Sequence, residues 1–229
     1  MVGLEWPKAH RIIRSVYPPI HLFEDIADPA DWELVISGET KTNPRVRDEI
    51  GDISLVPPNR RVSGAGASWV MAPFAYVSKA RPTRFSDGAY GVYYAGDRFD
   101  VALRETIHHF ERFLRATSEP VTAEDFRVLV GSITGKFHDI RGNKRFKSCL
   151  DPDDYAQSQS LGRLLRDRHG SNGIVYSSVR CREGEAVAAF WPDVVGIPTQ
   201  TQHLQYHWNG TRVDKYFVYG ESTWHLLAT

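Results

Sequence analysis

Residues 89–116 read AYGVYYAGDRFDVALRETIHHFERFLRA, a short aromatic segment followed directly by an amphipathic one. Residues 89–95 hold three tyrosines among small and β-branched residues, which is typical of a buried strand. Helical spacing then runs from about Phe99 to Ala116, with Asp97 or Asp100 as the expected capping residue. The expected core stripe of this helix is Leu103, Ile107, Phe110 and Leu114. We therefore expect a strand and a helix packed together at the centre of the fold.

Strand signals outnumber helix signals in the rest of the chain after residue 61. Further strands are expected over residues 68–77, 126–133, 173–179, 186–191, 202–208 and 211–218. The last two form an expected hairpin, because Asn209-Gly210 is a strong two-residue turn signal. A second helix is expected over 152–168. Since strands and helices do not alternate, the sequence predicts an α+β fold rather than a parallel α/β sheet.

The first sixty residues differ from the rest because they hold seven of the thirteen prolines. Short helices are expected over 30–36 and 45–50, each opened by an Asp-Pro or Asn-Pro pair. Prolines 57–58 and the glycine-containing segment 62–67 mark a boundary. We therefore expect an N-terminal helical extension, residues 1–60, packed on a main domain of residues 61–229.

Composition excludes several classes of protein. The 229 residues include 28 basic and 28 acidic side chains, and this zero net charge disfavours a dedicated nucleic-acid binder. No apolar run approaches the roughly 20 residues needed to cross a bilayer, and residues 1–14 do not resemble a signal peptide. Cys149 and Cys181 are expected to be unpaired thiols. These features predict a folded cytoplasmic protein without a membrane segment.

Glu105 lies on the helix face opposite the core stripe, together with His108, His109 and Arg112. Two interpretations stay open from periodicity alone. Glu105 could be solvated and paired with His109 at i+4, or it could be a carboxylate on the wall of a cleft. The adjacent histidines point about 100° apart on a helix and are poorly placed to share a metal ion, so no metal site is expected.

Two other clusters could carry chemistry or be purely structural. Arg84 precedes a glycine-punctuated loop, and a guanidinium can bind a phosphate bidentately. Tyr93 and Tyr94 follow it, and a tyrosine ring can stack on a planar ligand. Ser177 and Ser178 end a strand without a Gly-x-Ser-x-Gly elbow, which favours a hydroxyl that binds a ligand or orients a carboxylate over a nucleophile. The alternatives are a turn arginine, core tyrosines and serines at a plain strand end.

In this order the clusters resemble the RES domain, a family that supplies toxins of bacterial toxin–antitoxin systems and is named after an Arg, a Glu and a Ser. The resemblance covers residues 61–229, and the first sixty residues look like an extension found in a long subgroup. The matching segments are Arg84-Phe85, Tyr93-Tyr94-Ala95, residues 102–105 ending in Glu105, residues 157–162, and residues 175–178.

The resemblance implies an ADP-ribosyltransferase-like split β-structure with flanking helices. It also implies cleavage of the nicotinamide–ribose bond of NAD, by hydrolysis or phosphorolysis, with NAD as the substrate and no other cofactor. The partner would be an Xre-type helix-turn-helix antitoxin that covers the NAD cleft, so this chain itself would contact neither nucleic acid nor membrane. The implied catalytic residues are Glu105, Arg84 and Ser178, and the implied NAD-binding residues are Arg61, Tyr93, Tyr94 and Ser177.

A carboxylate such as Glu105 fits this chemistry, because breaking the glycosidic bond builds positive charge on the ribose. One departure from the family concerns a further arginine on the first strand of the domain. The expected strand over 68–77 has none, so Arg61, Arg60 or Arg14 would have to serve.

Other functions remain open at this point. The same pocket would suit a mono-ADP-ribosyltransferase that modifies a cellular protein. The chain could also be a non-enzymatic binding module, or an RNA-cleaving toxin that uses His108, His109 and Arg112 as acid–base groups. The neutral net charge counts against RNA.

Overall fold

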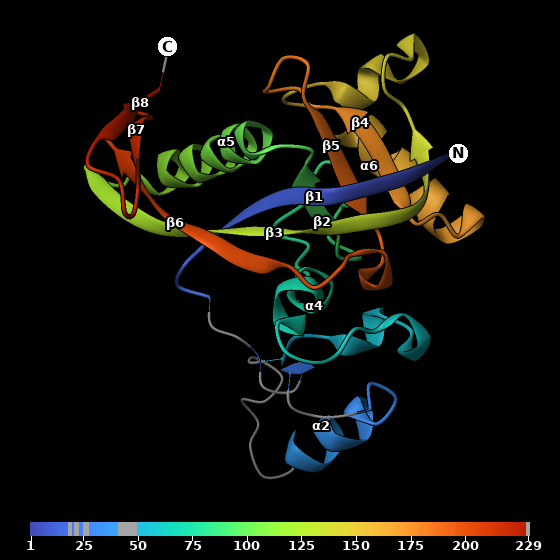
Figure 1. Ribbon diagram of the computed structural model, residues 1–229. Coiled ribbons are helices and arrows are strands. Elements are labelled where there is room, and N and C mark those ends of the chain that lie inside the picture. The colour runs from blue at the N-terminus through green and yellow to red at the C-terminus, as the bar shows by residue number, and fades with distance from the viewer. Residues whose placement is uncertain (18–19, 21–22, 25–27, 41–49, 228–229) are drawn as a thin grey trace.

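The computed structural model describes residues 1–17, 20, 23–24, 28–40 and 50–227, and shows a mixed sheet with helices on both faces (Figure 1). The strands are β1 (Val2–Arg14), β2 (Tyr93–Gly96), β3 (Thr122–Asp139), β4 (Gly173–Ser177), β5 (Glu185–Ala189), β6 (Thr199–Trp208), β7 (Val213–Val218) and β8 (Trp224–Leu226). The α-helices are α2 (Trp32–Thr40), α4 (Ala67–Ala75), α5 (Phe99–Thr117) and α6 (Ala156–Arg163). The shorter elements are η1 (Ile53–Leu55), η2 (Pro58–Arg60), η3 (Lys144–Leu150), a π-helical turn η4 (Leu164–Arg168) and η5 (Pro192–Val194).

The sheet is split into two parts that meet along β1 and β3. Its strand order is β1-β2-β5-β4-β3-β6-β7-β8, and β1 also pairs with β3, so the first five strands in this order close into a ring. Two of the junctions are narrow: β1 meets β2 at His10 and Gly96, and β3 meets β4 through a short parallel pairing. The predicted α+β class and the split β-structure with flanking helices are confirmed.

Three hydrophobic clusters hold the helices on the sheet. The first lies under α4 and α2 and includes Phe74, Ile133 and Val187. The second packs α5 onto β1, β3, β6 and β7, with Phe126 and Tyr206 stacked at 4.1 Å between ring centroids. The third lies on the other face of β2, β5 and β4, next to α6. In Figure 1, α5 accordingly lies on one side of β1 and β3, and α4 and α2 lie on the other.

Several sequence predictions are confirmed. The strands β6 and β7 form the predicted antiparallel hairpin around Asn209-Gly210, and β4 pairs antiparallel with β5. The helix α5 begins at Phe99 as predicted, although neither proposed aspartate caps it. The cap position is Arg98, and the Asp97 side chain accepts a hydrogen bond from the Glu185 amide instead.

The prediction that residues 1–60 form a helical extension is wrong for their first part. Residues 2–14 form β1, which pairs antiparallel with β3 in register from Val2–Phe137 to Arg14–Phe126. Leu4, Ala9 and Ile12 are buried on it. The physical reason is that the alternation of Val2, Leu4 and Trp6 with exposed residues breaks at Pro7-Lys8, where the pairing with β3 shifts register, so the strand pattern is interrupted.

The predicted strand over residues 68–77 is also wrong, because residues 67–75 form α4. Its buried residues Ala67, Val70, Met71, Phe74 and Ala75 follow the i, i+3, i+4, i+7, i+8 spacing of a helix. A short apolar run packed on several sides is ambiguous between strand and helix, and this spacing was the signal that decides it.

Two predicted helices are present but begin a few residues later than predicted. The helix expected after Asp28-Pro29 is α2, which begins at Trp32 after the Asp28 carboxylate accepts a hydrogen bond from the Ala30 amide. The helix expected over 152–168 begins later, at Ala156, and ends in the π-helical turn η4. The helix expected over 45–50 falls almost entirely outside the described residues.

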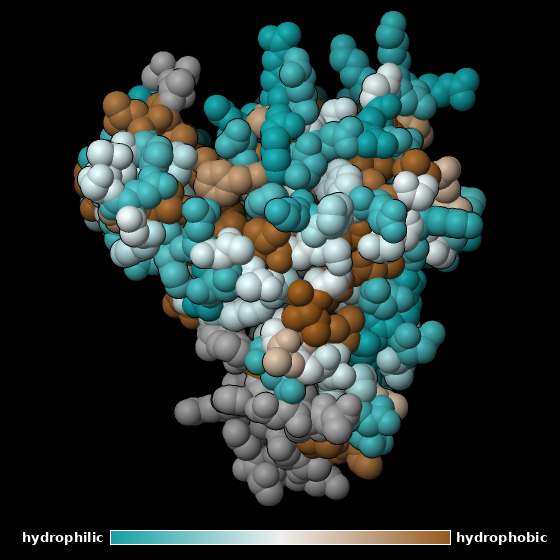
Figure 2. All heavy atoms as spheres, viewed as in Figure 1, coloured by the Kyte–Doolittle hydropathy of each residue, from teal (hydrophilic) through white to brown (hydrophobic). Residues whose placement is uncertain are grey.

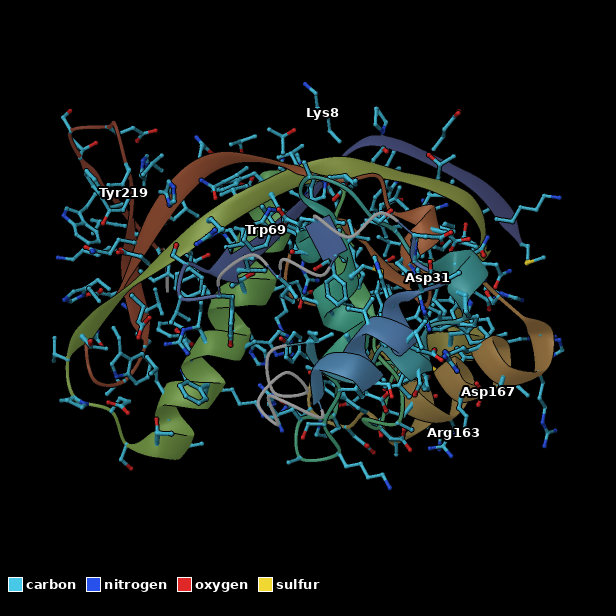
Figure 3. All side chains as sticks on the ribbon, turned by 90° about the horizontal axis from the view of Figure 1, so that it is seen from below. Lys8, Asp31, Trp69, Arg163, Asp167 and Tyr219 are labelled. Carbon is cyan, nitrogen blue, oxygen red and sulfur yellow. The ribbon has the colours of Figure 1, made fainter. Side chains whose placement is uncertain are left out.

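Seen from below in Figure 3, Trp69 of α4 lies near the central strands, whereas Tyr219 and Asp167 lie at opposite ends of the molecule.

Within the described part of the chain, no helix is both long and apolar enough to cross a membrane. Cys149 and Cys181 are both buried and unpaired.

Candidate active site

The structure brings Glu105 and Ser178 together from distant parts of the chain. The Ser178 hydroxyl donates a hydrogen bond of 2.9 Å to Glu105 Oε1. Glu105 projects from α5, and Ser178 directly follows β4. The Glu105 side chain keeps 23% of its surface exposed, so it can still reach a ligand. The interpretation of Glu105 as a carboxylate on a wall between elements therefore fits better than that of a solvated helix residue.

The turn after β4 explains why Ser178 is so firmly placed. Its hydroxyl oxygen accepts hydrogen bonds from the amides of Arg180 and Cys181, at 3.2 and 3.1 Å. Arg98, at the start of α5, donates to the carbonyl oxygens of Arg182 and Glu183 in the same turn. These contacts tie the turn to α5 and align Ser178 with Glu105. A hydroxyl that donates once and accepts twice is an orienting group rather than a free nucleophile.

Arg180 is the second polar neighbour of Glu105. Its Nε atom lies 3.6 Å from Glu105 Oε2, and its side chain is 13% exposed. Its terminal nitrogen Nη2 donates to the carbonyl oxygen of Pro152 at 3.0 Å. Sequence reasoning assigned Arg180 no role, although it stands two residues after Ser178, on the turn that Ser178 opens.

Arg84 is buried and reaches the loop that Arg180 contacts. It donates to the carbonyl oxygens of Asp151 and Cys149, at 2.7 and 3.3 Å. Its guanidinium carbon lies 4.6 Å from the ring centroid of Tyr155, which is a cation–π distance. The helix α6 approaches the same turn closely, because a Cβ on Gly162 would lie 2.3 Å from the carbonyl oxygen of Phe85. This contact gives residues 157–162 a structural role next to Arg84.

Tyr93 and Tyr94 do not face each other, because neighbouring residues of a strand point to opposite sides of the sheet. Tyr93 is buried in the first cluster beneath α4, whereas Tyr94 packs against the third. The Tyr94 hydroxyl accepts from the Phe85 amide and donates to Thr83, and burial raises the pKa of Tyr94 to about 12. The two tyrosines that the family resemblance implies as NAD-binding residues therefore cannot both stack on the same planar ring. Tyr94 instead fixes the turn that carries Arg84.

Tyr176 and Ser177 end β4 next to the site. Burial, followed by the charge of Glu105, raises the pKa of Tyr176 well above its usual value, so this phenol stays protonated. Tyr176 packs edge-on against Phe85, with ring centroids 5.1 Å apart. Ser177 lies on the same face of β4 as Val175, which is buried in the first cluster. Its role in ligand binding stays a prediction.

Arg61 lies away from this site, which corrects the expectation that it binds a phosphate of NAD. Its side chain is fully buried and donates to the carbonyl oxygens of Val56 and Pro29 and, at 2.5 Å, to the Glu33 carboxylate. All of these partners belong to the segment that packs beneath α4. The alternatives are also engaged: Arg14 pairs with Glu124 and Arg60 with Asp193.

The Arg61→Met variant should therefore lose stability rather than substrate affinity. Buried carbonyl groups would lose their donor, so we expect the free energy of unfolding to fall by about 3 kcal/mol. Urea denaturation measures this change, with the exposed Arg145→Met as the matched control. A raised KM for the substrate at unchanged stability would contradict the assignment of Arg61 to the scaffold.

The first strand, β1, carries Arg11 as well as Arg14. Arg11 donates to the Tyr94 carbonyl oxygen at 2.9 Å, and its guanidinium carbon is 4.5 Å from the Tyr93 ring centroid. The sequence lacked the family's arginine on its first strand only because residues 2–14 were predicted to belong to a helical extension. With β1 assigned, an arginine is present on the first strand.

The face of α5 around Glu105 is electropositive. Burial, followed by the charges of Arg180 and Arg112, lowers the pKa of His108 to about 4, so the ring is neutral at pH 7. The pKa of His109 is lowered in the same direction. In Figure 2, hydrophilic residues dominate the upper edge of the visible face, over the β4–β5 turn and η3. This surrounding would suit a polar, anionic ligand.

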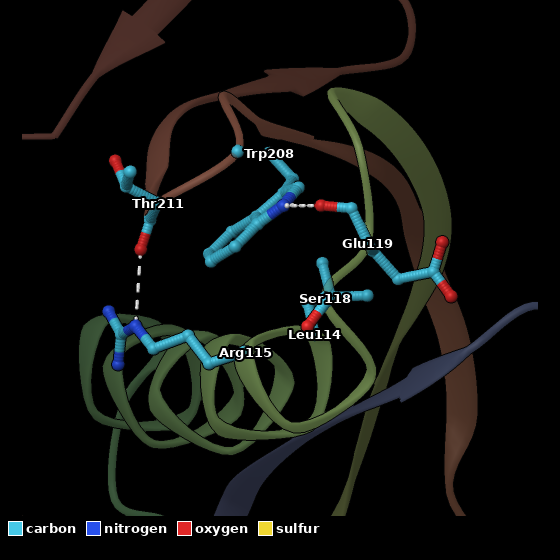
Figure 4. Close-up of a pocket in the computed structure, with 7 residues that line it drawn as sticks. Leu114, Arg115, Ser118, Glu119, Trp208 and Thr211 are labelled. Atoms are coloured by element: carbon cyan, nitrogen blue, oxygen red, sulfur yellow. Dashed lines mark hydrogen bonds between the residues drawn. The ribbon is translucent and has the colours of Figure 1, made fainter.

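A hollow of about 420 Å³ at the far end of α5 is not part of this site (Figure 4). It is lined by Leu114, Arg115, Ser118, Glu119, Trp208, Gly210 and Thr211. Leu114 stands nine residues after Glu105, which is about 14 Å along the helix. The polar groups in the hollow bond to one another: Trp208 donates to the Glu119 carbonyl oxygen and Arg115 to that of Thr211.

In the described part of the chain, no group of three or more His, Cys, Asp or Glu side chains is placed to hold a metal ion.

A protein-family model matches most of this chain. The family model described as the RES domain matches residues 58–209. A protein of Sinorhizobium fredii (strain NBRC 101917 / NGR234), "Uncharacterized protein y4oC", is 28% identical over 213 residues, which cover 93% of this chain and 88% of that protein. A solved structure, the M. tuberculosis MbcT–MbcA toxin–antitoxin complex, is similar with a TM-score of 0.42 and 11% identity, over 91% of this chain and 87% of that chain.

Proposed function

The chain belongs to the RES domain family, and from this premise we propose that it is an NAD-degrading toxin that cleaves the nicotinamide–ribose bond. The observation that carries the proposal is the hydrogen bond from Ser178 to Glu105 Oε1. It joins two of the residue types that name the family, 73 positions apart in the sequence. The third, Arg84, donates a hydrogen bond to Asp151, in the loop that Arg180 also contacts through Pro152.

The chemistry needs a carboxylate that is held in one orientation. When the bond between ribose C1′ and nicotinamide breaks, its electron pair moves to the pyridinium nitrogen, and nicotinamide leaves as a neutral molecule. Positive charge then develops on the ribose, as in glycoside hydrolysis. Since Ser178 holds Glu105 Oε1, Oε2 is left to accept a hydrogen bond from a ribose hydroxyl and to stabilise that charge.

The final acceptor distinguishes three versions of this reaction. Water would add its oxygen to C1′ and release a proton, phosphate would form a sugar phosphate, and a protein side chain would become ADP-ribosylated. NAD labelled in its adenine ring, incubated with and without phosphate and with cell extract, separates these outcomes. We expect the label in a small molecule. Label retained on protein would favour the alternative, a mono-ADP-ribosyltransferase.

Neutral histidines disfavour the alternative of an RNA-cleaving toxin. A general acid must be protonated near the working pH, and a pKa of about 4 leaves His108 uncharged there. We therefore expect His108→Gln to keep NAD cleavage within a few-fold of the wild-type rate.

The same variant has a predicted effect on the pH dependence of stability. The pKa of His108 is lower in the folded chain than in the unfolded one, so the unfolded state binds more protons as the pH falls from about 6.5 to about 4. The wild type loses stability through this window, and His108→Gln should lose less. Urea midpoints at pH 7, 5.5 and 4.5 measure the difference. Identical pH dependence of the two proteins would contradict a neutral, partly buried His108.

An active toxin of this kind needs a partner that restrains it. In line with the family resemblance, we propose a cognate Xre-type antitoxin that covers the surface around Glu105, in the cytoplasm where NAD is found. Expression of the chain alone should deplete NAD and stop growth, and co-expression with a helix-turn-helix protein encoded beside it should restore both. Growth arrest at a constant NAD level would count against this proposal.

A further inference from the structure

Arg180 has a buried donor without a partner. Its Nε atom is enclosed by protein and makes no hydrogen bond, and the nearest carboxylate oxygen, Glu105 Oε2, lies 3.6 Å away. This separation exceeds a normal hydrogen bond, so Arg180 does not clamp Glu105 in the way that Ser178 does. An unsatisfied buried donor is costly, and in a functional site it indicates a missing partner.

Arg180 and Arg84 converge on one short loop. Arg84 donates to the carbonyl oxygens of Cys149 and Asp151, and Arg180 donates to that of Pro152. Asp151 and Pro152 are consecutive, and consecutive Cα atoms are only about 3.8 Å apart. The guanidinium group of Arg180, from the turn after β4, and that of Arg84, from the turn before β2, therefore reach adjacent points of the same loop.

Among the described residues, neither arginine makes a hydrogen bond to a carboxylate. Glu105 Oε2 lies 3.6 Å from Arg180, and the Arg84 guanidinium donates to neutral carbonyl groups. Backbone hydrogen bonds and, to a lesser extent, the charge of Arg84 lower the pKa of Asp151. Two neighbouring like charges repel more strongly in a partly buried site than in water, and an anion between them would relieve this repulsion. Ser178 holds Oε1 of Glu105, and Oε2 is the carboxylate oxygen on the side of Arg180.

We propose that Arg180 and Arg84 together form a phosphate subsite, and that Arg180 is the second phosphate-binding arginine of this chain. The proposal rests on the proposed function and deepens it. The ligand it fits is a nucleotide whose ribose hydroxyl meets Glu105 while its phosphate meets the two guanidinium groups. Arg180 is then a substrate-binding residue. Its fork-shaped guanidinium is suited to phosphate oxygens in a way that a lysine is not.

The test compares Arg180→Gln with the wild-type chain in two assays. We expect the KM for NAD to rise about 10- to 100-fold, because a charge-assisted hydrogen-bonding pair is lost, while kcat changes by less than about threefold. ADP-ribose, which has the pyrophosphate but no nicotinamide, should lose affinity by a similar factor in calorimetry. The matched control is Arg182→Gln on the same turn, whose side chain is 95% exposed and should leave both values unchanged.

Three results would overturn the proposal. The first is wild-type protein that does not bind ADP-ribose. The second is unchanged ADP-ribose affinity in Arg180→Gln with a lowered kcat, which would mean that Arg180 acts through Glu105. If Arg180→Gln does not fold, Arg180→Lys decides instead: it should lose part of the ADP-ribose affinity, and wild-type affinity would be the third contradicting result. Failure of the proposed function has a different signature, namely wild-type protein that releases no nicotinamide.

Discussion

Replacing Glu105 with glutamine should slow NAD cleavage about a thousandfold, because the variant loses the negative charge that stabilises the ribose cation. The side chain keeps its shape, and its amide oxygen can still accept the hydrogen bond from Ser178. The free energy of unfolding should therefore change by less than about 1 kcal/mol. Initial rates of NAD loss and urea denaturation curves on the same preparations measure the two effects.

The matched control for this variant is Asp100→Asn, which removes one carboxylate from the exposed first turn of the same helix. It should cleave NAD at the wild-type rate. If Glu105→Gln kept the full rate, the assignment of the carboxylate would be wrong. A large loss of stability in Glu105→Gln would instead make Glu105 a scaffold residue.

Deleting residues 1–14 should abolish the folded state, which is the largest structural effect we expect. The deletion removes β1, opens the ring of strands and exposes the edge of β3 over its pairing with β1. It also removes the buried side chains of Leu4 and Ile12, and loss of such a side chain costs about 2–5 kcal/mol each. These two losses alone approach the total stability of a domain, about 5–15 kcal/mol, and the lost strand pairing adds to them.

Deletion of residues 220–229 is the control at the other end of the chain. It removes β8, a three-residue edge strand that pairs only with β7 among the described strands, and on which Leu226 is 82% exposed. This truncation should stay soluble and melt cooperatively at a lower temperature. Circular dichroism and thermal melts compare the two deletions. A sharp melting transition and normal NAD kinetics in the protein without residues 1–14 would show that β1 is dispensable.

The sequence predicted those elements whose signals are local. The hairpin of β6 and β7 follows from Asn209-Gly210, and α5 follows from an apolar stripe at helical spacing. Both signals lie within a few residues, so no tertiary information is needed to interpret them. The order of the clusters along the chain was enough to indicate the family, because it does not depend on where each strand begins.

The sequence predictions that the structure contradicts concern residues whose environment depends on tertiary packing. The alternating pattern of residues 2–6 is interrupted at Pro7-Lys8, where β1 shifts register against β3, so the strand and its partner could not be inferred from the local pattern. This error also hid Arg11 and led to Arg61, whose partners in the scaffold are visible only in the fold. Arg180 stands only two residues after Ser178 in the sequence, but its proximity to Glu105 comes from the way the turn after β4 packs on α5.

The measurement that tests the central claim most directly is the stoichiometry of nicotinamide release by the purified chain. Chromatography of a reaction with NAD should show one nicotinamide formed for each NAD lost with the wild type. The same reaction with Glu105→Gln should show about a thousandfold lower rate. Intact NAD after incubation with folded wild-type protein, or equal rates for the two proteins, would contradict the account.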